Sequence, residues 1–277
     1  MNDEPRLSRV FSKHSANGGA ALVTYLCAGD PDLDASFAHA LACIEGGADI
    51  LEIGCPFSDP TADGEAIARA SRRSIAGGGG LVQALELARR IRARSDVPLV
   101  LFGYFNPIFV HGEARTADDA ARAGVDALLV VDLPPEEDAD LRAALAVHAI
   151  GLVPLVAPTS TEARIEGLAA AQPKAPFVYY VSVAGVTGSG RADLGAASRR
   201  AGELRARIGS PCVVGFGVSD PEGAAKAAAH ADGVVVGTAI VRTIEDAARA
   251  HLPIEAQADR VRTLVGDLAA AVHAGAR

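Results

Sequence analysis

One acidic residue stands inside an apolar run near the start of the chain. Glu52 follows Ile50 and Leu51 and precedes Ile53, so the alternation of side chains along a strand places it on one face of the sheet. If that face lines the inside of a barrel, burial raises the pKa of the carboxyl group toward neutrality, where the group can both donate and accept protons. We interpret Glu52 as a general acid and base. The alternative is a buried structural carboxylate paired with an Arg or Lys side chain.

Further acidic side chains occupy expected loops. Asp59 stands in an Asp-Pro pair and Asp63 in an Asp-Gly pair, and both pairs are typical of turns. These patterns alone therefore predict turn residues at both positions. Asp132 ends the apolar run that begins at residue 127, and its role is open between a turn residue and a carboxylate that helps to align a pocket.

Glycines after two apolar runs indicate a phosphate site. The segment 214–221, VGFGVSDP, leads into an expected helix with Pro221 as its first residue, and the segment 236–239, VGTA, follows another run. Glycines expose backbone N–H groups, and a helix N-terminus carries the positive end of the helix dipole. Residues 211–225 contain no Lys or Arg, so main-chain dipoles would hold the phosphate. The alternative is that Gly217 and Gly237 only form tight turns.

Aromatic residues make up 4% of the chain, yet several stand at the ends of apolar runs. These residues are Tyr25, Phe102, Tyr104, Phe177, Tyr179 and Phe216. Each one taken singly is interpreted as a core residue. Several of them together at the mouth of a barrel would fit a flat apolar ligand with a phosphate tail.

Eight short apolar runs must position these residues. The expected strands are 20–26, 50–53, 98–104, 127–131, 152–156, 177–181, 212–216 and 233–236. The expected helices between them are 35–45, 81–94, 117–123, 136–147, 161–170 and 221–229. Val, Ile and Leu dominate the runs with little polar alternation, which is typical of parallel strands covered on their outer face.

Eight such units in about 250 residues fit a closed (β/α)8 TIM barrel better than an open doubly wound sheet. We expect an extra N-terminal helix, residues 7–14, to plug the bottom of the barrel, a phosphate-site helix, and a closing helix over residues 253–274. No linker divides the chain, so residues 1–277 are expected to form a single domain. In this fold the loops at the carboxyl ends of the strands carry the chemistry.

Composition excludes several classes of protein. The 277 residues are 49% hydrophobic and 22% charged with a net charge of −8, which excludes a disordered chain and disfavours binding to nucleic acid or an anionic membrane. No run is long and apolar enough for a membrane span, and the N-terminus lacks an apolar signal core, so we expect a cytoplasmic protein. The four cysteines and seven histidines lack metal-ligand spacing, so no metal and no disulfide are expected.

Taken together, the residues resemble the alpha subunit of tryptophan synthase. The segment 52–64, EIGCPFSDPTADG, is similar to the signature loop of that family. Segments 25–31, 103–107, 130–134, 182–188 and 215–219 follow in the family's order and spacing. The resemblance covers nearly the whole chain.

The resemblance implies a lyase of tryptophan biosynthesis that splits indole-3-glycerol phosphate into indole and glyceraldehyde 3-phosphate. By resemblance, Glu52 and Asp63 match the catalytic carboxylates of the family. Residues that match the indole pocket, the tyrosine beside the catalytic pair, the lid threonine and the phosphate site are Tyr25, Phe102, Leu129, Tyr179, Thr187, Gly188, Phe216, Gly217, Gly237 and Thr238. We add Tyr104 to these substrate-binding residues because it is one of the aromatic residues at the end of an apolar run.

The resemblance also implies a partner. The alpha subunit docks on a beta subunit that carries pyridoxal phosphate, in an α2β2 heterotetramer, and no cofactor is expected in this chain. Pro56, Asp59 and Asn106 match the contact surface.

Two other interpretations stay open at this point. A different phosphate-binding barrel, such as a sugar-phosphate isomerase, would explain the glycines after two strands but not the segment 52–64. A catalytically weak scaffold that activates a beta-type partner would explain the resemblance without activity. Intact Glu52 and Asp63 weigh against the scaffold.

Overall fold

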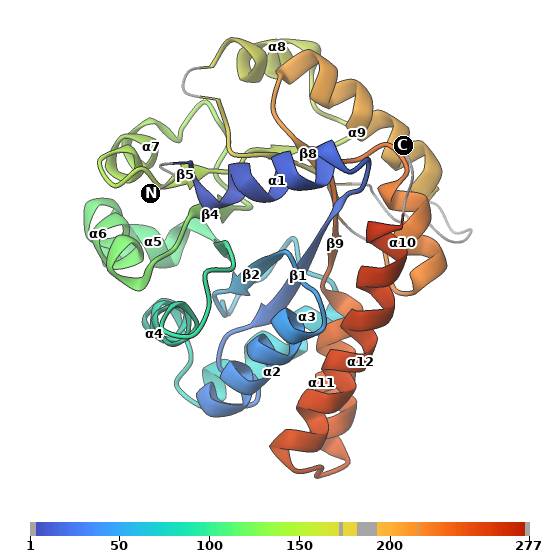
Figure 1. Ribbon diagram of the computed structural model, residues 1–277. Helices are drawn as coiled ribbons and strands as arrows, with labels where there is room; N and C mark the ends of the chain where they lie inside the picture. The colour runs from blue at the N-terminus through green and yellow to red at the C-terminus, as the bar shows by residue number, and fades with distance from the viewer. Residues whose placement is uncertain (1–3, 172–173, 182–192, 216, 275–277) are drawn as a thin grey trace.

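The computed structural model describes residues 4–171, 174–181, 193–215 and 217–274 (Figure 1). Within these residues, parallel strands form one curled sheet in the order β5-β4-β3-β2-β1-β9-β8-β7-β6. The strands are β1 (Ala21–Cys27), β2 (Ile50–Gly54), β3 (Leu99–Gly103), β4 (Ala127–Val130), β5 (Gly151–Leu152), β6 (Leu155–Val156), β7 (Val178–Val181), β8 (Cys212–Gly215) and β9 (Gly233–Val236). Each expected strand is confirmed, with bounds shifted by a few residues.

The sheet closes into a barrel through residues 151–156. β5 pairs with β4, and β6 pairs with β7. Between them, the Val153 N–H donates to the Leu128 carbonyl at 2.8 Å, and the Tyr179 N–H donates to the Pro154 carbonyl at 3.0 Å. Pro154 has no N–H of its own to donate, and this divides one barrel strand into the short pieces β5 and β6. The structure is therefore the expected (β/α)8 barrel, with its fifth strand interrupted.

Helices follow the strands and cover the outside of the barrel (Figure 1). They are α1 (Arg6–Ala16), α2 (Leu33–Glu45), α3 (Glu65–Ala76), α4 (Leu81–Arg92), α5 (Phe105–His111), α6 (Glu113–Ala123), α7 (Ala139–Ala146), α8 (Glu162–Ala170), α9 (Leu194–Ile208), α10 (Pro221–Ala228), α11 (Thr238–Arg249) and α12 (Ile254–His273). In this part of the chain, no helix combines the length and the apolar character needed to cross a lipid bilayer.

Four of these helices, α3, α5, α9 and α11, have no counterpart among the helix ranges predicted from the sequence. The buried positions of α3 are alanines and serines, so its buried face carries little apolar periodicity. α5 has only seven residues and begins directly after β3. Small buried residues therefore hid α3, and short length hid α5. Neither reason applies to α9, which has 15 residues, or to α11, which buries Ile240, Val241 and Ile244.

The barrel separates two apolar layers. Along β1, Val23 and Tyr25 point into the barrel, whereas Leu22 and Leu26 pack outward against the helices. Alternation along a strand produces this division. The inner layer also contains Glu52, because β2 places it in register with Tyr25 of β1.

Helix α1 closes the amino-terminal end of the barrel (Figure 1). Its buried Leu7 and Phe11 join the inner layer, and the Phe11 ring lies 5.6 Å from the ring of Phe177, which precedes β7. The predicted N-terminal plug is thereby confirmed. The closing helix α12 packs against α2, α10 and α11, also as expected from the sequence.

The plug generates a stability prediction. Replacing Phe11, which is 5% exposed, with Ala is expected to lower the free energy of unfolding by about 3–5 kcal/mol, because the change leaves a cavity inside the barrel. Urea denaturation of the purified chain measures this change. The matched control is Phe109→Ala, since Phe109 is 66% exposed and should change stability by less than about 0.5 kcal/mol. Equal losses in the two variants would contradict the role of α1 in the core.

Candidate active site

A cavity opens at the carboxyl-terminal end of the barrel, opposite α1. Its volume is about 470 Å³, part of which is open to solvent. The residues that line it are Tyr25, Glu52, Asp63, Ile67, Phe102, Tyr179, Gly217, Val218, Val235, Gly237 and Thr238. The lining comes from strands β1, β2, β3, β7 and β9, from two loops, and from the starts of α3 and α11. These elements bring together most of the residues singled out in the sequence. Ile67, Val218 and Val235 were missed, although the alternation in 233–236 could have indicated Val235.

Glu52 lies at the bottom of this cavity in a dry environment. The residue is 1% exposed, and neither carboxyl oxygen has a hydrogen-bond partner among the described residues. Burial disfavours the charged form and raises the pKa of Glu52 to about 8. The carboxyl group is therefore mostly protonated at neutral pH. The alternative interpretation, a structural carboxylate paired with Arg or Lys, finds no such pair in the described part of the chain.

Asp63 stands in the loop between β2 and α3, in a less buried position. Burial raises its pKa to about 6, and a side-chain hydrogen bond with Tyr104 acts in the opposite direction. The Asp63 carboxyl group is thus mostly ionised at neutral pH. The two acids of the cavity titrate on opposite sides of neutrality, which separates a proton donor from a fixed negative charge.

Tyr104 supports the Asp63 loop from below. Its hydroxyl oxygen accepts a hydrogen bond from the Ala62 N–H at 3.0 Å, and its ring lies 5.0 Å from the ring of Phe57. Tyr104 does not appear among the residues that line the cavity, where we had expected it to bind substrate. In the structure it contacts the loop that presents Asp63.

Tyr25 and Tyr179 form walls beside the two acids. Burial raises the pKa of both phenols, and Glu52 and Asp63 raise it further through their nearby negative charges. Each ring packs against a glycine of a neighbouring strand: a Cβ on Gly54 would lie 2.2 Å from the Tyr25 hydroxyl, and one on Gly215 would lie 2.2 Å from the Tyr179 hydroxyl. Glycine is therefore required at both positions to leave room for the phenols.

Another part of the cavity lining contains two glycines and the start of a helix. Gly217 has a φ of 86°, and Gly237 precedes the first residue of α11, Thr238. Among the described residues no side chain caps the N-terminus of α11, whereas the Asp220 carboxylate caps that of α10 by accepting a hydrogen bond from the Gly223 N–H at 2.8 Å. The start of α11 therefore has N–H groups available for an anion at the cavity wall.

An ionic cluster links α3, which follows the Asp63 loop, to α11, which begins at the glycine-lined part of the cavity. The buried carboxylate of Glu245 on α11 accepts hydrogen bonds from Arg69 and Arg73 of α3, at distances of 2.8–2.9 Å. Arg73 also donates two hydrogen bonds to Asp30, which follows β1. α3 begins directly after the Asp63 loop, so the cluster holds that loop in a defined position relative to the start of α11.

Other residues singled out in the sequence lie elsewhere. Leu129 is fully buried inside the barrel, in register with Phe102, and does not line the cavity. The expectation that Phe177 lies at the mouth of the barrel is wrong, because it packs against Phe11 at the opposite end. Asp132 accepts a hydrogen bond from the Phe105 N–H at 2.7 Å, so it caps α5.

Some candidates are surface residues or lie beyond the described part. Pro56 is buried, whereas Asp59 and Asn106 are exposed. Thr187, Gly188 and Phe216 lie outside the described residues. All four cysteines are free thiols.

Known proteins resemble this chain over almost its full length. The family model described as tryptophan synthase alpha chain matches residues 11–273. The tryptophan synthase alpha chain of Geobacter sulfurreducens is 48% identical over 247 residues, which cover 89% of this chain and 93% of the relative. The corresponding chain of Citrifermentans bemidjiense is 49% identical over 240 residues and covers 87% and 89%, respectively.

Solved structures agree with these sequences. Tryptophan synthase subunit alpha from Legionella pneumophila superimposes with a TM-score of 0.87 at 31% identity, covering 97% of this chain and 98% of that chain. A tryptophan synthase structure from M. tuberculosis gives a TM-score of 0.84 at 36% identity, covering 98% and 99%. The (β/α)8 fold and the resemblance expected from the sequence are both confirmed.

The unpartnered acid generates a prediction about stability and pH. Between its ordinary value of 4.5 and its raised pKa of about 8, Glu52 holds a proton in the folded chain that the unfolded chain releases. Its contribution to the free energy of unfolding therefore falls as the pH rises through this window, by about 1.4 kcal/mol per pH unit.

The variant Glu52→Gln does not titrate, so its stability relative to the unchanged chain is expected to rise from about pH 5 to about pH 8. Urea denaturation at several pH values measures the difference. Glu137→Gln, at an exposed position, is the control and should show no such trend. A constant difference for Glu52→Gln across this range would show that the carboxyl group is not held protonated.

Proposed function

The chain belongs to the tryptophan synthase alpha chain family, and from this we propose that Glu52 and Asp63 are the residues that perform the family's reaction. That family catalyses the cleavage of indole-3-glycerol phosphate in tryptophan biosynthesis. The observation that carries the assignment is the pair of acids in one cavity, one with its pKa raised to about 8 and the other to about 6. Tyr25, Phe102 and Tyr179 line the cavity beside the acids, and Gly217, Gly237 and Thr238 complete it.

Bond cleavage requires proton movement at two atoms of the substrate. The indole carbon bonded to the glycerol chain must gain a proton so that the ring can leave, and the adjacent glycerol hydroxyl must lose a proton to become an aldehyde. We assign both transfers to Glu52, which enters protonated, protonates the ring carbon, and then accepts the hydroxyl proton. After one turnover Glu52 is protonated again, so the enzyme has neither gained nor lost a proton.

Positive charge develops on the ring nitrogen while the ring carbon is protonated. We propose that the ionised Asp63 carboxylate stabilises this charge by accepting a hydrogen bond from the indole N–H. Tyr104 supports this role because its hydroxyl group hydrogen-bonds with Asp63 and with the loop backbone at Ala62. Tyr104 is then a positioning residue for Asp63.

The phosphate group is proposed to bind at the start of α11, against Gly217, Gly237 and Thr238. The N-terminus of this helix, which no side chain of the described residues caps, and the glycine backbone supply N–H donors. The described lining of the cavity contains no basic side chain. Holding the anionic end orients the indole ring between Tyr25, Phe102 and the acids. Thr187, Gly188 and Phe216 remain predictions from the resemblance, and Leu129 is proposed to shape the pocket from below.

The proposed chemistry uses only carboxyl groups and backbone dipoles. We propose that this chain binds no cofactor, since in this family pyridoxal phosphate is carried by the beta subunit.

The four free thiols fit a reducing compartment, so we propose a cytoplasmic location. We also propose that residues 1–277 form one domain.

An assay of indole release from indole-3-glycerol phosphate tests the assignment. Glu52→Gln is expected to lower kcat by about 10²–10⁴-fold, and Asp63→Asn by about 10²-fold or more. Glu137→Gln is the matched control and should keep the rate of the unchanged chain. Full activity of either active-site variant would contradict its assignment. If the unchanged chain releases no indole but raises the turnover of the beta subunit, the scaffold interpretation is correct.

In the same assay, kcat/KM is expected to be highest between about pH 6 and about pH 8, where Asp63 is ionised and Glu52 is protonated. Tyr104→Phe removes the hydrogen bond that lowers the pKa of Asp63. It should therefore move the acidic limb of the profile to higher pH and leave the alkaline limb in place. A profile that does not move would show that Tyr104 does not act through Asp63.

We propose that the partner is a tryptophan synthase beta subunit in an α2β2 heterotetramer, with Pro56, Asp59 and Asn106 at the contact. Next to Asn106, helix α5 exposes Phe109 and Val110, which are 66% and 77% exposed. Large apolar side chains at the surface favour a protein interface at this face. The contact would be connected to the active site, because α5 follows Tyr104, which holds the Asp63 loop.

A charge introduced on this face should weaken the complex. Phe109→Asp is expected to raise the Kd for the cognate beta subunit by about 30-fold or more, as measured by titration with sedimentation velocity. The matched control is Val147→Asp, because Val147 is 79% exposed and follows α7. If both variants bind the beta subunit as the unchanged chain does, the proposed contact surface is wrong.

A further inference from the structure

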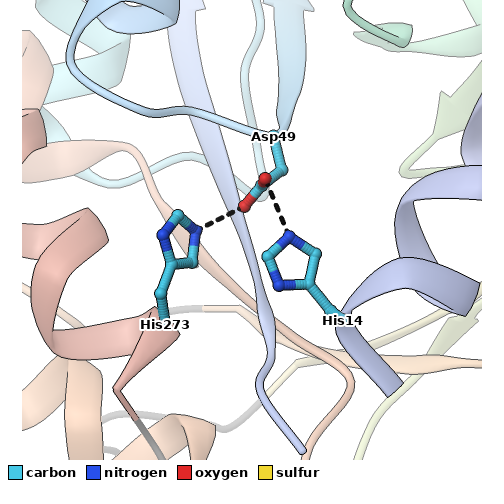
Figure 2. A group of neighbouring side chains, drawn as sticks. All are labelled: His14, Asp49 and His273. Atoms are coloured by element: carbon cyan, nitrogen blue, oxygen red, sulfur yellow. Dashed lines mark hydrogen bonds and ion pairs between the residues drawn. The ribbon is translucent and has the colours of Figure 1, made fainter. Parts of the chain in front are cut away.

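Two histidines and one aspartate from distant parts of the chain meet at the amino-terminal end of the barrel (Figure 2). His14 lies on α1, Asp49 directly precedes β2, and His273 is the last residue of α12. Nε2 of His14 lies 2.8 Å from one carboxylate oxygen of Asp49, and Nε2 of His273 lies 2.7 Å from the other. These three ligand atoms all lie within 4.8 Å of one another.

The carboxylate at the centre of this cluster is ionised. The Leu22 N–H donates a hydrogen bond to it at 2.9 Å. Although burial acts to raise the pKa of Asp49, hydrogen bonds from His14 and His273 outweigh it and hold the pKa well below its usual range. An ionised carboxylate only accepts hydrogen bonds, so each imidazole directs an Nε2–H toward it.

We propose that His14, Asp49 and His273 form a binding site for a divalent transition metal ion, with Zn²⁺ as the ion that fits best. Two imidazole nitrogens and one carboxylate oxygen are a set of three protein ligands found around Zn²⁺, with water in the fourth position. Imidazole ligands favour transition metals over Mg²⁺ and Ca²⁺, which prefer oxygen ligands throughout.

Only small movements separate the hydrogen-bonded arrangement from a coordinated one. Tetrahedral Zn²⁺ with bonds of about 2.0–2.1 Å holds its ligand atoms about 3.3 Å apart. Each Nε2 must therefore move back by about half an ångström from the Asp49 oxygen that it now contacts. The ligand atoms, which lie within 4.8 Å of one another, must also come to about 3.3 Å from each other around one ion. The imidazole rings are stacked with centroids 5.0 Å apart and an interplanar angle of 30°, so both approach the carboxylate side by side. A ring that binds the ion through Nε2 carries its N–H on Nδ1.

Solvent can reach the site from one side. The side chain of His273 is 34% exposed, whereas those of His14 and Asp49 are 9% and 14% exposed. An ion would therefore approach past His273 and reach the two more buried ligands. Once bound, it would connect the plug helix α1, the start of β2 and the closing helix α12, so it would stabilise the folded chain.

The experiment titrates ZnCl2 into the full chain after removal of metals with EDTA. Isothermal titration calorimetry is expected to give one ion per chain, and the thermal unfolding midpoint should rise as zinc is added. Co²⁺ serves as a second probe, because its visible absorption reports nitrogen and oxygen ligands directly. None of these measurements depends on indole release, so a failure of the zinc proposal can be distinguished from a failure of the proposed reaction.

The variants His14→Gln and His273→Gln separate coordination from hydrogen bonding. A glutamine amide can still donate a hydrogen bond to Asp49 but is a poor zinc ligand. Each variant is expected to weaken zinc binding by about 100-fold or more and to abolish the zinc-induced rise in the unfolding midpoint. The matched control is His148→Gln, because His148 forms a single hydrogen-bonded pair with Asp118 at 2.8 Å on the surface.

The control variant should bind zinc as the unchanged chain does. Absence of binding to the unchanged chain would overturn the proposal, and so would binding that survives in both His14→Gln and His273→Gln. Equal loss in His148→Gln would assign the ion to the surface pair instead. Circular dichroism of each variant without zinc establishes that the fold is intact before the comparison is made.

Discussion

The burial of the Glu52 carboxyl group without a hydrogen-bonding partner in the described residues is the constraint on which the chemistry depends. A carboxylate in that position would lose its hydration without compensation, so the protonated form is favoured. The surrounding structure maintains this condition. Tyr25 and Tyr179 wall off the acid with neutral phenols, and Gly54 and Gly215 leave the space that these rings need. A barrel interior provides such dryness because every strand has a neighbour on both sides and helices cover the outside.

The rest of the site supplies what the barrel interior lacks. Asp63 stands on a loop, where partial hydration and Tyr104 keep its pKa lower than that of Glu52. The start of α11 provides N–H groups that carry no net charge, so they do not lower the pKa of Glu52 as a nearby Lys or Arg side chain would. Glu245 binds arginines of α3 from its position on α11, so the loop that carries Asp63 and the helix that begins at the proposed phosphate site are held as one unit.

Sequence patterns located the strands and Glu52 but left other parts of the site undetermined. Contiguous runs of Val, Ile and Leu predicted every barrel strand, because buried parallel strands are apolar on both faces. Alternation within 50–53 indicated that Glu52 faces one side, and the structure places it inside. Asp63 was indistinguishable from a turn residue until the resemblance of 52–64 was considered, since an Asp-Gly pair has the same local signature in either role. α3 and α11 escaped prediction, although one follows the Asp63 loop and the other begins at the proposed phosphate site.

The sequence by itself determined the barrel, its plug and closing helices, and the type of acid available at its centre, because these depend on local periodicity. Tertiary structure decided which residues meet. Tyr104 contacts the Asp63 loop rather than the cavity, Phe177 packs at the plug, and Asp132 caps α5. His14, Asp49 and His273 share no spacing that would indicate a common site, and only the folding of α1 and α12 against the start of β2 brings them together. Contacts between residues far apart in the chain arise from packing, and a pattern read along the chain does not contain them.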